Sequence, residues 1–218
     1  MRLGTRTCKW LVGTYLTLLG VWWLIIWTDN LIAKPWKGPW RAQVVDAETG
    51  HPLEGVVVLF WWRRCYLGDA HCVGTYYDSE EVVTGVDGRF VIAARRSLVP
   101  LLPFLTHYEG PERVIFKPGY GLWSFQRHPL EKLREKLPPA EQRRQVEQHR
   151  PILEQWYHEQ WARFEGEGAV IELPPLKTKE ERLDFYHEFN EASAVPLQQK
   201  QHLKEAEMAE RAFLGFRR

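Results

Sequence analysis

The sequence predicts a mainly β domain that follows an apolar N-terminal segment and carries added helices. Between residues 40 and 120, short runs rich in valine, isoleucine and aromatic residues alternate with turn residues, a pattern typical of strands. Later segments are rich in Glu, Gln, Arg and Leu, which favour helices. Residues 10–27 contain no charged side chain. Together these observations predict an apolar segment, then strands, then helices with one late strand between them.

The composition limits the classes of function. The chain has 218 residues, of which 44% are hydrophobic, and this is enough for one domain with a core and additional segments. The formal net charge is only +1, so no overall attraction to nucleic acid is expected. The sequence has no Walker A loop, no G-x-S-x-G motif and no C-x-x-C pair. We therefore predict neither a cofactor nor a nucleic-acid partner.

The apolar run at residues 10–27 predicts a membrane anchor. A helix needs about 20 apolar residues to cross a bilayer, with a lower limit of roughly 17. The run is longer than the apolar core of a secretory signal, about 7–15 residues, and no well-placed cleavage site follows it. We interpret it as an uncleaved signal anchor, with tryptophans at the membrane interface. A cleaved signal is the alternative.

The orientation of this anchor rests on a small charge difference. Arg2, Arg6 and Lys9 precede the run, and three basic residues follow it closely: Lys34, Lys37 and Arg41. Basic residues favour the cytoplasmic side, so the rule discriminates weakly here. The N-terminal amine favours a cytoplasmic N-terminus. We therefore predict a single-pass protein of the inner membrane with its body in the periplasm.

Residues 42–60 form the strongest local pattern, a hairpin-like strand–turn–strand. Asp46 and Gly50 bound a turn, Pro52 and Gly55 follow it, and residues 56–60 are mostly β-branched. The D-G pair at residues 87–88 predicts a second hairpin, joining residues 81–84 to residues 89–93. The strands expected are residues 40–46, 56–62, 72–77, 81–84, 89–93, 113–117 and 169–173.

Two helical segments are expected beyond these strands. Residues 130–165 favour helix, with a second helix starting at Pro138-Pro139 and a break or kink at Pro151. Its apolar stripe predicts packing on the strands, and the alternative is a partner-binding arm. In the C-terminal tail, Thr178 followed by Glu181 predicts a capped helix start. A further helix is expected at residues 198–213.

Two motifs resemble the carboxypeptidase regulatory-like domain: V-D-A-E-T-G-H-P-L-E-G-V-V-V at residues 45–58 and T-G-V-D-G-R-F-V-I at residues 84–92. The F-K-P-G-Y run at residues 116–120 also fits. The resemblance covers residues 40–120, with residues 169–173 as the last strand. It implies a transthyretin-like (prealbumin-like) β-sandwich of about seven strands, in which the motif residues form turns and core rather than a catalytic site.

The resemblance also gives a division of the chain. Residues 1–39 are expected to form a cytoplasmic tail, the anchor and a stalk. Residues 40–176 would be the sandwich, with a helical insertion at 129–166, and residues 177–218 a helical tail. The run L-P-P-L-K-T-K-E-E-R-L at residues 173–183 resembles the tail of membrane-anchored bacterial proteins of unknown role.

Cysteine and histidine residues are candidate metal ligands or redox partners. Cys65 and Cys72 are close in sequence and could form a disulfide in an oxidising compartment, or remain two reduced thiols. His71 lies beside Cys72 and near Asp69 and Asp78, and a metal site there could include His51 and His107 only if the loops meet. No spacing matches a known metal site, so we predict none.

Exposed aromatic and arginine side chains favour a binding function. The candidate surface contains Trp61, Arg63, Arg64, Tyr66 and Tyr77, which would suit a protein or glycan partner in the cell envelope. Strand alternation predicts burial of Phe60 and Trp62 and leaves Trp61, Tyr66 and Tyr77 open. We interpret the chain as a non-catalytic binding or structural module.

The alternative is a hydrolase or metal-dependent enzyme on the same fold. Hydrolases of the transthyretin-like branch end in a Y-R-G-S-type sequence, whereas this chain ends G-F-R-R. A helical adaptor, with residues 130–165 as the binding element, is a third reading.

Overall fold

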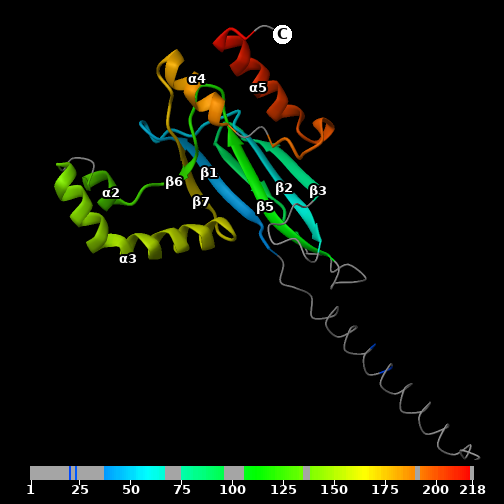
Figure 1. Cartoon of the computed structure of the whole chain (residues 1–218), viewed down its shortest axis with the longest axis horizontal. Coiled ribbons are helices and arrows are strands. Elements are labelled where there is room, and N and C mark those ends of the chain that lie inside the picture. The colour runs from blue at the N-terminus through cyan, green and yellow to red at the C-terminus, as the bar shows by residue number, and fades with distance from the viewer. Residues whose placement is uncertain are drawn as a thin grey trace, which may run out of the picture.

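The structure is a computed structural model that describes residues 20, 23, 37–66, 75–95, 106–134, 138–189 and 192–216. Within this part of the chain, seven strands form two sheets, accompanied by four α-helices (Figure 1). Sheet 1 has the strand order β4-β1-β7-β6, and sheet 2 has the order β3-β2-β5. All neighbours are antiparallel except β1 and β7, which run parallel.

The elements have the following bounds. Sheet 1 consists of β1 (Trp40–Asp46), β4 (Arg89–Ile92), β6 (Ser124–Phe125) and β7 (Ala169–Leu173). Sheet 2 consists of β2 (Val57–Tyr66), β3 (Thr75–Val83) and β5 (Thr106–Phe116). The helices are α2 (Pro129–Arg134), α3 (Pro139–Phe164), α4 (Lys179–Glu188) and α5 (Gln201–Leu214), with the short 3-10 helix η1 (Leu197–Gln199) before α5.

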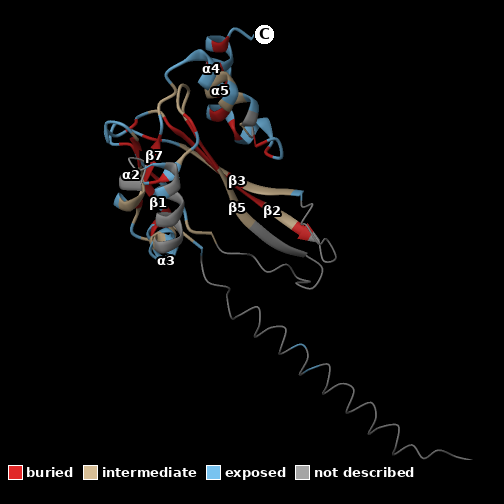
Figure 2. Ribbon diagram, turned by 60° about the vertical axis from the view of Figure 1, so that its left-hand side comes forward, coloured by how far each residue is buried: buried red, intermediate tan, exposed pale blue. Residues whose placement is uncertain are grey.

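The two sheets pack face to face around one core. Alternate residues of β2 point toward sheet 1, where they join a buried cluster with side chains such as Trp40 and Ile171. Among them, Phe60 is 0% and Trp62 is 9% exposed, so the predicted burial of both is confirmed. Figure 2 shows the buried residues concentrated along the strands.

The opposite face of β2 is buried in a second core. Val57, Leu59 and Trp61 lie there with Phe116 of β5. The C-terminal helical unit, which we define as α4, η1, α5 and the described residues between them, covers this face. It contributes Leu203, together with the side chains of Phe185, Phe189, Val195 and Ala206. Because both faces are covered, β2 is apolar at consecutive positions rather than alternating.

The strand–turn–strand at residues 42–60 is confirmed, but the hairpin predicted at residues 81–93 is wrong, because in both places the chain crosses from one sheet to the other. β1 lies in sheet 1 and β2 in sheet 2, and β4 pairs with β1 rather than with β3. Gly88 determines the second crossing: its N–H and C=O bond to Gly85 and Val44, and a Cβ there would lie 2.4 Å from the Val44 carbonyl oxygen. A turn sequence thus specifies a reversal but not the partner of the strand that follows.

Other boundaries differ from the sequence prediction. The expected strands 72–77 and 81–84 form one strand, β3, although residues 72–74 lie outside the described residues. β2 and β5 extend further than predicted, and β6 was not predicted at all. Helix α3 continues through Pro151 without a break. The late strand 169–173 is confirmed as β7.

The end of α3 packs against the sheets through Trp161 of the predicted apolar stripe, whereas Tyr157 of that stripe is 40% exposed. Phe164 is fully buried, with ring contacts to Phe60, Phe90 and Phe125 from both sheets. The Arg113 guanidinium of β5 lies 4.1 Å from the Trp161 ring centre. Burial of this guanidinium lowers the pKa of Arg113. Figure 1 shows α2 and the first part of α3 beside the sheets rather than over them.

Polar contacts hold the C-terminal helical unit together and attach it to β3. Thr178 and Glu181 form the predicted capping box at the start of α4. Glu81 of β3 accepts hydrogen bonds from the backbone N–H groups of His202 and Leu203, at 3.0 and 2.8 Å, at the start of α5. Arg182 of α4 pairs with Glu210 of α5, whose side chain is 2% exposed.

The predicted anchor, residues 10–27, lies outside the described residues except for Gly20 and Trp23, which are helical. Among the helices that the structure describes, none combines the length and the apolar character that a membrane span requires.

Candidate functional site

The predicted aromatic–arginine surface does not form one exposed patch. Trp61 is 3% exposed and belongs to the second core under the C-terminal helical unit, so it is unavailable to a partner. Arg63 pairs with Glu112 of β5. The Arg64 guanidinium lies 5.5 Å from the ring centre of Tyr77, which packs against the main core. The side chain of Tyr66, at the end of β2, is outside the described part of the structure.

The cysteine and histidine candidates are only partly within the described residues. Cys65 is fully buried and disulfide-bonded. Cys72, its predicted partner, lies outside the described residues, as do Asp69 and His71, so the pairing stays a prediction. His51 is exposed, whereas Asp78 forms an ion pair with Arg95. Among the described residues, no group of three or more His, Cys, Asp or Glu side chains is placed to hold a metal ion.

The turn motif around Asp46 is a second candidate site, because a buried carboxylate lies beside a tyrosine. One Asp46 oxygen accepts hydrogen bonds from the N–H groups of Glu48 and Thr49, and the other accepts from the Tyr120 hydroxyl at 3.2 Å. Burial alone raises the pKa of Asp46, but these hydrogen bonds outweigh it and hold that pKa below its ordinary value. Burial and the bond to Asp46 raise the pKa of Tyr120. These contacts fix the turn.

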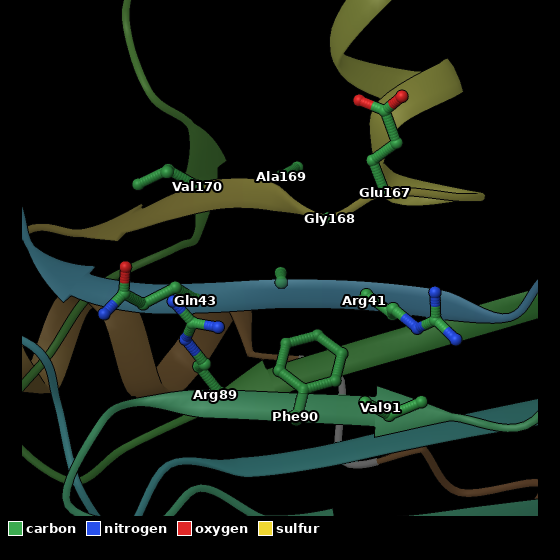
Figure 3. A pocket seen from close by; sticks show the side chains of 10 residues that line it. Arg41, Gln43, Arg89, Phe90, Val91, Glu167, Gly168, Ala169 and Val170 are labelled. Carbon is green, nitrogen blue, oxygen red and sulfur yellow. The ribbon is translucent and has the colours of Figure 1, made fainter.

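A shallow pocket lies on the outer face of sheet 1 and has a volume of about 250 Å³ (Figure 3). We call it the arginine pocket. Arg41 and Gln43 reach it from β1, Arg89 and Val91 from β4, and the segment leading into β7 completes it. The lining residues are Arg41, Ala42, Gln43, Arg89, Phe90, Val91, Glu167, Gly168, Ala169 and Val170.

The polar groups of the pocket are only partly used within the protein. Arg41 donates one hydrogen bond to the Gly166 carbonyl oxygen, at 3.1 Å. Gln43 donates to the Asp87 carbonyl oxygen, at 2.9 Å. No hydrogen bond or ion pair joins the Arg89 guanidinium or the Glu167 carboxylate to the part of the chain that the structure describes. The pocket therefore presents charged groups that are available to a ligand.

Strand alternation explains why these residues meet. In β1, Trp40 and Ala42 point into the core, so Arg41 and Gln43 point outward. In β4, Phe90 and Ile92 point inward, so Arg89 and Val91 share the outer face. The two strands pair with Gln43 opposite Arg89 and Arg41 opposite Val91.

The sequence prediction missed this pocket, although each strand was expected. The outward positions could have been read from alternation in residues 40–46 and 89–93. The pairing of those two strands could not be predicted from the sequence, because the turn signal favoured a hairpin between residues 81–84 and 89–93. Comparison of the chain with protein-family models, with curated proteins and with solved structures found no match.

Proposed function

We propose that this protein is a membrane-anchored, extracytoplasmic binding module built on a transthyretin-like β-sandwich, and that the arginine pocket is its ligand contact. The observation that carries the binding function is an exposed pocket in which the Arg89 guanidinium has no partner in the described part of the chain. Charged side chains held on paired strands are positioned before a ligand arrives, which lowers the entropy cost of binding.

The carboxypeptidase regulatory-like assignment is supported by how the motif residues are used. Asp46 organises the turn after β1, and Gly50, Gly55 and Gly88 all have positive φ, between 68° and 72°. Glycine adopts this conformation at little cost, whereas other residues are strained there. Two sheets with a shared core, joined by these turns, fit the architecture that the resemblance implies.

The short distance between the apolar run and the start of β1 supports the anchored arrangement. Lys37 and Arg95 exchange backbone hydrogen bonds, at 3.3 and 3.0 Å, just before β1 begins. The apolar run ends at residue 27, so only about ten residues separate a membrane surface from the body, roughly 35 Å at full extension. Trp23, within the run, is 64% exposed, as a side chain facing lipid would be.

The hydrolase alternative receives less support. The lining residues of the arginine pocket include no serine, cysteine, histidine or tyrosine, so the pocket offers no ordinary nucleophile or general base apart from Glu167. We therefore favour binding over hydrolysis for this pocket.

Reporter fusions test the topology. A reporter that is active only outside the cytoplasm, fused to the C-terminus of the full chain, should give signal. Signal from a cytoplasmic reporter instead would overturn the proposed localisation.

Thiol labelling tests the disulfide. In native membranes, labelling without reductant should spare Cys65 even after denaturation, and the substitution Cys72→Ser should make Cys65 reactive.

Crosslinking in native membranes tests the pocket. A photo-crosslinking residue replacing Val91, which is 52% exposed, should capture a partner, and Arg89→Gln should abolish the capture. The same residue replacing Met208 on α5, which is 43% exposed, is the matched control and should capture nothing that depends on Arg89. Capture that is insensitive to Arg89→Gln would contradict a function for this pocket.

A further inference from the structure

We propose that the arginine pocket binds an acidic peptide segment in an extended conformation. This inference rests on the proposed binding function and names the chemical class of the ligand. It follows from three properties of the pocket: its available guanidinium groups, their spacing along paired strands, and the aliphatic surface between them.

The available charge favours a carboxylate ligand. Arg89 has no hydrogen-bond or ion-pair partner within the described residues, and Arg41 uses one N–H group on the Gly166 carbonyl. A guanidinium presents its N–H groups in a planar fork that matches the two oxygens of a carboxylate. Arg41 and Arg89 together therefore offer two positions at which an anion can be bound.

The spacing of the two arginines matches an extended chain. Arg89 lies opposite Gln43, so Arg41 and Arg89 are diagonal neighbours, with Cβ atoms roughly 7–8 Å apart. Figure 3 shows the Arg89 side chain lying over β1 beside Gln43, whereas the Arg41 side chain runs along β1 the other way. In an extended peptide, side chains on one face recur about every 7 Å. Because the two side chains diverge, their guanidinium groups lie further apart than their Cβ atoms, and acidic residues two or four positions apart on one face can reach both.

The surface between the arginines favours a peptide over an acidic sugar. Val91 is 52% exposed and Val170 is half-buried, so the pocket presents aliphatic groups. Phe90 is the one aromatic lining residue, and it is only 5% exposed. Sugar rings bind well when they can stack on an open aromatic face, which this pocket does not offer. The methylene groups of the ligand's acidic side chains would contact Val91, because the residues between them on an extended chain face away from the pocket.

Glu167 allows a test of whether the ligand is acidic or basic. It is the one acidic residue that lines the pocket, and Figure 3 shows its carboxylate pointing away from the strands. An acidic ligand is repelled by this charge, so Glu167→Gln should strengthen binding. A basic ligand would be attracted by it, and the same substitution would then weaken binding.

The test uses the full-length chain in detergent and two synthetic peptides. Ac-Glu-Ala-Glu-Ala-Glu-NH2 carries acidic groups on one face of an extended chain, and Ac-Gln-Ala-Gln-Ala-Gln-NH2 is its neutral match. Isothermal titration calorimetry should detect the acidic peptide and not the neutral one. Arg89→Gln should weaken binding roughly fivefold or more, and Glu167→Gln should strengthen it about twofold. Arg211→Gln, an exposed position on α5, removes the same charge elsewhere and should leave binding unchanged.

Several outcomes would overturn the inference. These are equal binding of the two peptides, equal weakening by Arg89→Gln and Arg211→Gln, or weakening by Glu167→Gln. Tighter binding of trigalacturonic acid than of the acidic peptide would assign the pocket to an acidic glycan and reject a peptide. The titration does not depend on the membrane. A failed topology test therefore does not affect the peptide-binding inference, and failed peptide binding does not affect the proposed membrane anchor.

Discussion

Replacing Arg182 by methionine should weaken the contact between α4 and α5 and lower the stability of the fold. The Glu210 side chain is 2% exposed, and its carboxylate accepts hydrogen bonds from the Arg182 Nε, at 2.7 Å, and from the Gly119 N–H, at 3.0 Å. Arg182 also lies 3.5 Å from the ring centre of Phe213. Arg182→Met leaves a buried carboxylate with one backbone donor, since methionine fills the space but brings no charge.

The expected loss of unfolding free energy is about 3–5 kcal/mol, the usual cost of removing one partner of a buried ion pair. The double variant Arg182→Met/Glu210→Met removes both charges and should be more stable than Arg182→Met alone, because no charge stays buried without its partner. Arg182→Lys keeps the charge but loses the planar fork, so its loss should be intermediate.

Urea unfolding of the full-length chain in detergent, followed by circular dichroism, measures these free energies. Lys177→Met is the matched control, since it breaks an exposed pair with Glu48 and should change the free energy of unfolding little. A loss of unfolding free energy below about 1 kcal/mol for Arg182→Met would refute the reasoning. So would a double variant whose loss equals the sum of the losses of Arg182→Met and Glu210→Met measured singly.

Three further predictions concern the core, a helix start and acid stability. Phe164→Ala should reduce the unfolding free energy by about 3–5 kcal/mol in urea titrations, whereas Phe213→Ala, at a position 54% exposed, should cost far less. Glu81→Ala should cost about 0.5–2 kcal/mol and increase hydrogen exchange at His202 and Leu203, because it removes the acceptor for both N–H groups; unchanged exchange would contradict this. The pKa of Asp46 is lower in the folded state than its ordinary value of 3.8, so its contribution is present above that value and is lost as the pH falls through the lowered pKa. The difference in unfolding free energy between the natural chain and Asp46→Asn should therefore be larger near neutral pH than at about pH 3, and a constant difference would count against it.

The parts of the fold that could be predicted are those specified by local chemistry. Residues 40–46 and 169–173 match β1 and β7, because their β-branched and apolar residues end at clear turn or proline signals. The Thr178–Glu181 capping box was likewise readable, since both groups lie within one helical turn. In each case the deciding interactions lie within a few residues of one another.

Features that depend on distant residues could not be predicted. β6 is two residues long and exists because it pairs with β7, more than 40 residues later. Pro151 lies inside α3 and does not break it, although its missing N–H predicts a break or a kink there. Trp61 was predicted to belong to a binding surface, but it is buried in the second core with Leu203 of α5. The arginine pocket needs β1 and β4 side by side, and local turn chemistry pointed to a different pairing.

The position of β1 determines how the body would respond to tension from its N-terminal side. The chain enters through the Lys37–Arg95 bridge and continues directly into β1, which lies between β4 and β7 in the interior of sheet 1. A pull at residue 37 acts along this strand, so the hydrogen bonds to both neighbours are loaded in shear and must fail together. An edge strand would instead be peeled off one bond at a time. If the chain is tethered on its N-terminal side, as proposed, the tether would therefore pull on a mechanically strong strand.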